Sequence, residues 1–157
     1  MEARVKLWRL VRVGHAVLDG TGTLAHGGRY SPPGLPVVNF ASEPGLSVLI
    51  ALRYLPRDLS GIAEDYVLGW TEIAAVPERV PAGLAEEAIR DFVGDWLESR
   101  RSLLMAVPSR VLPEGDVVMM NPRHPAAVHV PALTTRPFSF AQCLHTPPMA
   151  ARYAGQQ

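Results

Sequence analysis

The sequence has little that could cross-link the chain or hold it in a membrane. Cys143 is the only cysteine among 157 residues, which excludes an internal disulfide and a metal site built from several cysteines. The richest apolar run, Leu46 to Leu52, is far shorter than the roughly 20 residues that span a bilayer. The first residues mix basic and apolar side chains, unlike a signal peptide. We therefore expect a cytoplasmic protein that does not enter a membrane.

Net charge is also absent. The 15 basic and 15 acidic residues cancel, so no overall field attracts nucleic acid, and direct nucleic-acid binding is disfavoured. The histidines are scattered without the spacing of metal ligands, so we expect no metal: His15, His26, His124, His129 and His145. A hydrophobic content of 48% predicts one domain over residues 1–157, with a core from about 5 to 145 and a proline-rich C-terminal tail.

The apolar pattern predicts several strands and two main helices. Ser42, Glu43 and Pro44 are typical of a helix start, with Ser42 as the cap and the helix ending near Tyr54. Because strands and helices do not alternate regularly, we predict an α+β fold with a mixed central sheet flanked by helices. The expected strands are 5–13, 37–40, 66–76 with a possible break at Gly69, 103–107, 117–120 and 127–130, and an amphipathic helix is expected over 84–99.

Two loop clusters carry residues that could bind a ligand. Gly27 and Gly28 would let the backbone approach a ligand closely, Arg29 offers a planar donor fork for a pyrophosphate, and Tyr30 could stack on a flat ring. A glycine turn with a solvated arginine is the alternative interpretation. Ser109 and Asn121 follow predicted strands and bring a hydroxyl and an amide into loops, although both are also ordinary turn residues.

Together these segments resemble the RES family, found as toxins paired with Xre-type antitoxins. The resemblance covers roughly residues 6–144 and rests on short motifs in the family's order. They are Trp8-Arg9-Leu10, Gly27-Gly28-Arg29-Tyr30, Val37 to Glu43 followed by Leu46 to Leu52, Val107-Pro108-Ser109, Asn121 to Pro125, and Pro137 to Phe140.

The resemblance implies a fold like that of ADP-ribosyltransferases and an enzyme that cleaves the nicotinamide–ribose bond of NAD, as a glycohydrolase, a phosphorylase or an ADP-ribosyltransferase. It implies catalytic roles for three residues: Arg29 at the pyrophosphate, Tyr30 at the nicotinamide end and Ser109 at a ribose or phosphate. Gly28, Phe40 and Asn121 would complete the NAD site. A cognate Xre-type antitoxin would be the partner in a hetero-oligomer.

The sequence departs from the family pattern at the catalytic carboxylate. Alignment on the family helix places Ile50 where the family has a glutamate, Phe40 where a tyrosine is usual, and Ala141 at the closing aspartate. The spacing of Leu46, Leu49 and Ile50 alone would predict a buried helical stripe. Three interpretations stay open: an active toxin with a displaced acid at Glu43, Glu64 or Glu72, a degenerate RES domain that binds a partner or a nucleotide, and an unrelated α+β domain.

Overall fold

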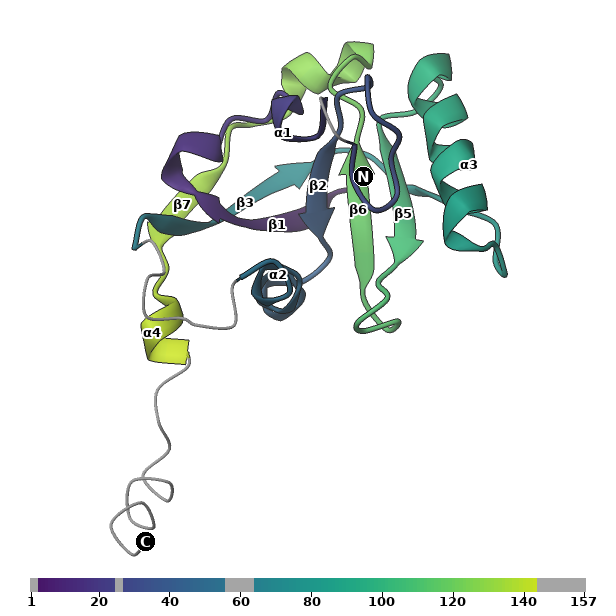
Figure 1. The fold of residues 1–157 in the computed structure, drawn as a ribbon. Coiled ribbons are helices and arrows are strands. Elements are labelled where there is room, and N and C mark those ends of the chain that lie inside the picture. Colours follow the sequence, from purple (N-terminus) through teal and green to yellow (C-terminus); the bar gives the residue numbers. More distant parts are fainter. Residues whose placement is uncertain (1–2, 25–26, 56–63, 144–157) are drawn as a thin grey trace, which may run out of the picture.

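The sheet of this protein is mixed, which confirms the predicted α+β fold. The computed structural model describes residues 3–24, 27–55 and 64–143, and within them seven strands form one sheet of order β4-β5-β6-β2-β1-β3-β7 (Figure 1). Only β4 and β5 are paired in parallel. The strands are β1 (Val5–Arg12), β2 (Val38–Ala41), β3 (Tyr66–Ile73), β4 (Glu78–Arg79), β5 (Leu104–Pro108), β6 (Asp116–Met120) and β7 (Thr134–Pro137).

Two apolar clusters bury the two faces of the sheet. One gathers alternate residues of the central strands, including Leu7, Phe40 and Val118, and partly buried residues from 126–133 cover it. The other packs Val93, Trp96 and Leu97 of helix α3 (Glu86–Ser99) against β5 and β6. The predicted helix over 84–99 is confirmed, with its acids on the solvent side. Helix α3 therefore stands beside β5, at the end of the sheet away from β7 (Figure 1).

Helix α2 (Pro44–Leu52) follows β2 directly, as predicted, but Ser42 does not cap it. The N-cap residue is Glu43, whose side chain makes no capping bond. The hydroxyl oxygen of Ser42 instead accepts a hydrogen bond from the backbone nitrogen of Asp116 at 2.9 Å, which ties the start of the helix to β6. The helix ends at Leu52, and residues 53 and 54 continue as a turn, two residues short of the predicted end.

The strand predicted at 127–130 is wrong, because this segment is the 3-10 helix η3 (Pro125–His129). Pro125 presets its first turn, and the Nδ1 atom of His124 accepts a hydrogen bond from Ala126 at 3.0 Å. The last strand, β7, comes later and lies at the sheet edge, where Pro137 can pair without a backbone donor.

Strand β3 runs without a break through Gly69. This glycine leaves room for Leu133, since a Cβ atom there would lie 2.9 Å from the leucine Cδ1.

The remaining helical segments are short: η1 (Val13–His15), α1 (Thr21–Leu24) and α4 (Phe140–Cys143). None of the helices found within the three described ranges is long and apolar enough to cross a membrane. The predicted proline-rich tail lies outside the described residues beyond Cys143.

Candidate functional site

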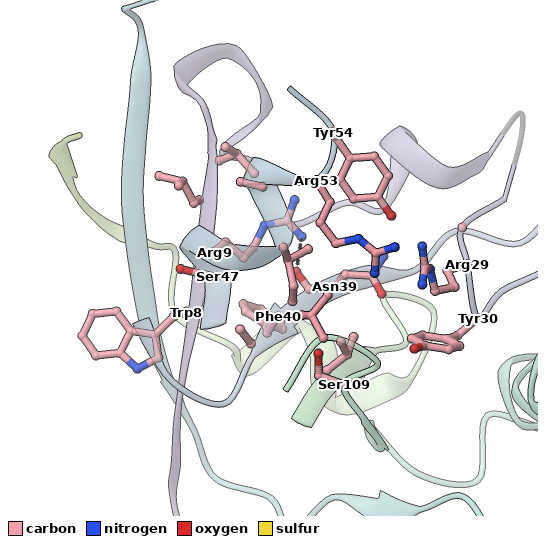
Figure 2. Close-up of a pocket in the computed structure, with 18 of the residues that line it drawn as sticks. Trp8, Arg9, Arg29, Tyr30, Asn39, Phe40, Ser47, Arg53, Tyr54 and Ser109 are labelled. Carbon is pink, nitrogen blue, oxygen red and sulfur yellow. Dashed lines mark hydrogen bonds between the residues drawn. The ribbon is translucent and has the colours of Figure 1, made fainter. Parts of the chain in front are cut away.

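A cavity of about 450 Å³ opens between the loop at 27–30, helix α2 and strands β1 and β2 (Figure 2). The turn between β5 and β6 closes it from below. Six of the seven residues expected at the site line this cavity: Gly28, Arg29, Tyr30, Phe40, Ile50 and Ser109. Residues as far apart in sequence as Trp8 and Val117 thus converge on one pocket.

The loop that carries Arg29 is a tight, internally bonded turn. Gly27 has a φ of +73°, and a Cβ atom there would lie 2.6 Å from the Ser31 carbonyl oxygen, so glycine is required. The backbone nitrogen of Gly28 donates to the Ser31 carbonyl at 3.0 Å and approaches its hydroxyl oxygen at 3.1 Å. This nitrogen is therefore used inside the loop, and Gly28 contributes shape to the pocket.

Helix α3 holds the same loop from outside. Arg90 donates a hydrogen bond to the carbonyl oxygen of Arg29 at 3.1 Å. Gly94 lets Pro32 pack closely, since a Cβ atom at Gly94 would lie 3.1 Å from the proline ring. The backbone of the loop is thus anchored on a rigid helix while the Arg29 side chain is left for the cavity.

The guanidinium of Arg29 is incompletely bonded. Its Nη1 atom is buried and has no hydrogen-bond partner in the part of the chain that the structure describes. A buried donor of this kind costs free energy unless it finds an acceptor. The unsatisfied nitrogen therefore indicates a site for an external anion, beside the ring of Tyr30 (Figure 2).

Ser109 and Ile50 both line the cavity, from the end of β5 and from α2. Ser109 is buried at the end of β5, where its backbone nitrogen donates to Gly115 at 2.8 Å. Ile50 is half-buried on the pocket side of α2, and Leu49 is 42% exposed. The buried helical stripe expected from Leu46, Leu49 and Ile50 is therefore wrong except at Leu46, because the side of α2 that carries Ile50 faces a cavity rather than the core.

Asn121 does not belong to this group. It is buried away from the pocket, its amide nitrogen donates to the Leu97 carbonyl at 2.9 Å, and its amide oxygen accepts from the Arg123 backbone at 3.0 Å. Both ends of the amide are used to join α3 to the end of β6. The structure therefore places Asn121 outside the cavity that the other six expected residues line.

Two cationic residues on the cavity wall were missed as site residues. Arg9 lies on β1, bonds the Asn39 carbonyl at 3.0 Å and has a buried Nε atom without a partner among the described residues. Burial lowers the pKa of the Arg9 guanidinium to about 10, and the charge of Asp19 opposes this shift. Arg53 follows α2 and points toward Arg29 (Figure 2). In the sequence, Arg9 belongs to the Trp8-Arg9-Leu10 motif but nothing marks it as a site residue, and no pattern marks Arg53.

The cavity wall formed by the described residues contains no carboxylate. Glu43, Glu64 and Glu72, the candidates for a displaced acid, are all exposed and line no part of the pocket. No cluster of three or more histidine, cysteine, aspartate or glutamate residues that could hold a metal occurs in the described ranges. The arrangement can bind an anion next to aromatic rings.

The structure thus defines an α+β protein with an arginine-lined pocket at the junction of a mixed sheet and a short helix. The RES domain model matches residues 6–141, in agreement with the resemblance expected over 6–144. The chain is 34% identical over 131 residues to the Prs ADP-ribosylating toxin of Sphingobium sp. strain YBL2, covering 76% of this chain and 81% of that protein. It is 32% identical over 128 residues to Toxin Res of Pseudomonas putida, covering 77% and 87%. The chain belongs to the RES domain family.

The fold is shared with a solved structure of low sequence identity. A chain of the crystal structure of the M. tuberculosis MbcT–MbcA toxin–antitoxin complex superposes with a TM-score of 0.69 at 16% identity. The match covers 90% of this chain and 88% of the other. At this identity the likeness shows the common fold.

Proposed function

We propose that this chain is a RES-type toxin of a bacterial toxin–antitoxin system that binds NAD and cleaves its nicotinamide–ribose bond, at a rate lowered by Ile50. The observation that carries the proposal is the unsatisfied guanidinium of Arg29 beside Tyr30 in a cavity of about 450 Å³. A pyrophosphate would supply the missing acceptors, and an arginine fork fits its oxygens. The printed names of the two relatives, both toxins and one ADP-ribosylating, support the same function.

In this proposal each lining residue has one task. Arg29 binds the pyrophosphate, Tyr30 and Phe40 pack against the ligand rings, and Ser109 binds a ribose or phosphate oxygen. Cleavage breaks the bond between the ribose carbon and the ring nitrogen, the electron pair leaves with nicotinamide, and the ribosyl cation is captured by water, phosphate or a protein nucleophile. A carboxylate beneath the ribose would stabilise that cation. Ile50 stands at the aligned position and supplies no charge.

A second function is favoured by the lack of an acid among the described lining residues. Without a carboxylate, the domain would bind a nucleotide or a partner and leave the bond intact. A nicotinamide-release assay separates the two. The wild type should be slow, and Ile50→Glu should be faster by about a hundredfold. Because Ile50 is only half-buried at the cavity, the new carboxylate should not prevent folding. Unchanged release in a folded Ile50→Glu variant would contradict the enzymatic proposal.

NAD binding itself is tested by calorimetry with Arg29→Ala. Loss of the fork should weaken binding about tenfold or more, and Arg29→Lys should restore little, since an ammonium cannot copy the fork. Arg136→Ala is the matched control, because Arg136 is exposed on β7 and does not line the cavity. Absence of NAD binding at millimolar concentration, or equal binding by Arg29→Ala, would refute this part of the proposal.

The partner proposed is an Xre-type antitoxin, in a hetero-oligomer formed in the cytoplasm. The complex named in the solved structure of the same fold supports an antitoxin partner. Because the chain carries a formal net charge of zero, DNA binding is left to that partner. The chain is co-expressed with a small helical protein encoded by an adjacent reading frame. Size-exclusion chromatography should then yield a complex of both chains. Recovery of the free chain alone would contradict the pairing.

A further inference from the structure

The balance of charge in the cavity has a consequence for the ligand. Arg9, Arg29 and Arg53 reach it from three separate segments, and the guanidinium groups of Arg29 and Arg53 face each other across it (Figure 2). None of the three forms an ion pair with an acid in residues 3–24, 27–55 or 64–143. Like charges that face one another repel, and the described lining residues include no acid, so the cavity wall carries a cationic potential that an anionic ligand would neutralise.

Asp19 offsets part of this potential, because its charge acts on Arg9. It lies in a smaller adjoining cavity, which Arg9 also lines, and accepts two hydrogen bonds from Thr21, at 3.1 and 2.9 Å. On the α2 side, Ile50 and Ala51 are apolar, and the Ser47 hydroxyl donates to the Pro44 carbonyl at 2.6 Å, so these residues add no charge. An added positive charge on the ligand would thus meet three cations and no carboxylate on the described wall.

NAD⁺ and NADH differ in such a positive charge, which lies on the nicotinamide ring. They share the negative pyrophosphate, whereas the nicotinamide ring is a cation in NAD⁺ and neutral in NADH. The Tyr30 ring can pack against both forms, and its attraction for a cation is weaker than the repulsion from several full charges. We propose that the pocket discriminates by ring charge and binds the reduced dinucleotide, NADH, more tightly than NAD⁺. This inference rests on the proposed function, since it takes the cavity as the dinucleotide site.

Direct titration of the wild-type protein with each dinucleotide tests the inference, by calorimetry for both and by fluorescence for NADH. We expect NADH to bind about tenfold more tightly, which corresponds to about 1.4 kcal/mol. ADP-ribose, which has the pyrophosphate and lacks the ring, should also bind more tightly than NAD⁺. Equal affinities, or tighter binding of NAD⁺, would overturn the inference and leave the proposed NAD site intact. Failure of both dinucleotides to bind would overturn the proposed function as well.

Two variants show whether charge is the cause. Ile50→Glu should reduce the NADH preference to near unity, whereas Ile50→Gln, of similar size and without charge, should keep it. Arg53→Gln removes one cation from an exposed position where folding is not at risk, and should shrink the preference about twofold to threefold. Identical preferences in the wild type, Ile50→Glu and Arg53→Gln would show that ring charge does not decide the selectivity.

Discussion

The arginines of this protein fall into two groups that differ in how they are paired. On the surface, Arg12 pairs with Asp65 at 2.9 Å, Arg79 with Asp116 at 2.8 Å and Arg101 with Glu78 at 3.1 Å. Around the cavity, Arg9 and Arg29 keep buried nitrogen atoms without a partner in the described structure. The three surface arginines thus have acidic partners, whereas the two arginines of the pocket wall keep nitrogen atoms that a ligand could bond.

The largest change in stability is expected at Asn121, whose amide is hydrogen-bonded within the protein at both ends. Asn121→Ala removes an amide that bonds Leu97 and Arg123, and it leaves the buried Leu97 carbonyl and the part-buried Arg123 nitrogen without this partner. The free energy of unfolding should fall by about 2–3 kcal/mol. Affinity for NAD should stay unchanged, because Asn121 lies outside the pocket. Urea unfolding and calorimetry measure the two quantities. A stable variant with weakened NAD binding would return Asn121 to the site.

The second prediction concerns Arg9, whose buried Nε atom has no hydrogen-bond partner among the described residues. Arg9→Met removes a charge whose lowered pKa reports unfavourable burial, a penalty that is fully present at neutral pH because the group is protonated well below a pKa of about 10. The apolar replacement should raise the free energy of unfolding by roughly 1 kcal/mol. The same change should weaken NAD binding, since a cation is lost from the wall. Denaturant titration and calorimetry on one sample check both signs.

The opposite result for Arg9→Met would contradict the difference drawn between surface arginines and cavity arginines. Lower stability together with unchanged NAD affinity would place Arg9 among the structural arginines. The hydrogen bond from Arg9 to the Asn39 carbonyl would then be its main contribution. Leu10→Met is a suitable control, because Leu10 follows Arg9 on β1, also lines the cavity and carries no charge.

The smallest expected effect concerns a paired surface arginine. Hydrogen bonds from Arg101 and Ser102 lower the pKa of the Glu78 carboxyl. A lowered pKa in the folded state adds stability above the ordinary pKa of a glutamate, and this stability is lost as pH falls through the lowered value. Arg101→Gln should therefore cost less than about 1 kcal/mol at neutral pH, because the pair is partly exposed.

The pH dependence distinguishes this effect from a general loss of packing. Unfolding of the wild type and Arg101→Gln by urea should differ at pH 7 and converge toward pH 3. A constant difference across that range would show that Arg101 acts through packing on Phe92, whose ring lies 5.6 Å from the guanidinium carbon, rather than through Glu78.

Sequence patterns were sufficient where local physics decides the outcome. The apolar period of residues 84–99 predicted α3, and short apolar segments predicted β1, β2, β5 and β6 to within a few positions. They were insufficient at 127–130, where alternation resembled a strand but Pro125 and the His124 side chain set a 3-10 turn. The strand β4 was missed because two residues carry no period, and it exists only through its pairing with β5.

The fold class, the family and the residue types of the site can be predicted from the chain alone, because motif order and hydrophobic period are properties of the sequence. Which of those residues meet depends on packing between distant segments. Asn121 and Ser109 both follow strands, but only Ser109 lines the pocket. The Asn121 amide instead donates a hydrogen bond to the Leu97 carbonyl of α3. The tertiary structure also turned Ile50 from an apparent core residue into part of a cavity wall, because the rotation of α2 against β1 and β2 is set by packing between distant segments.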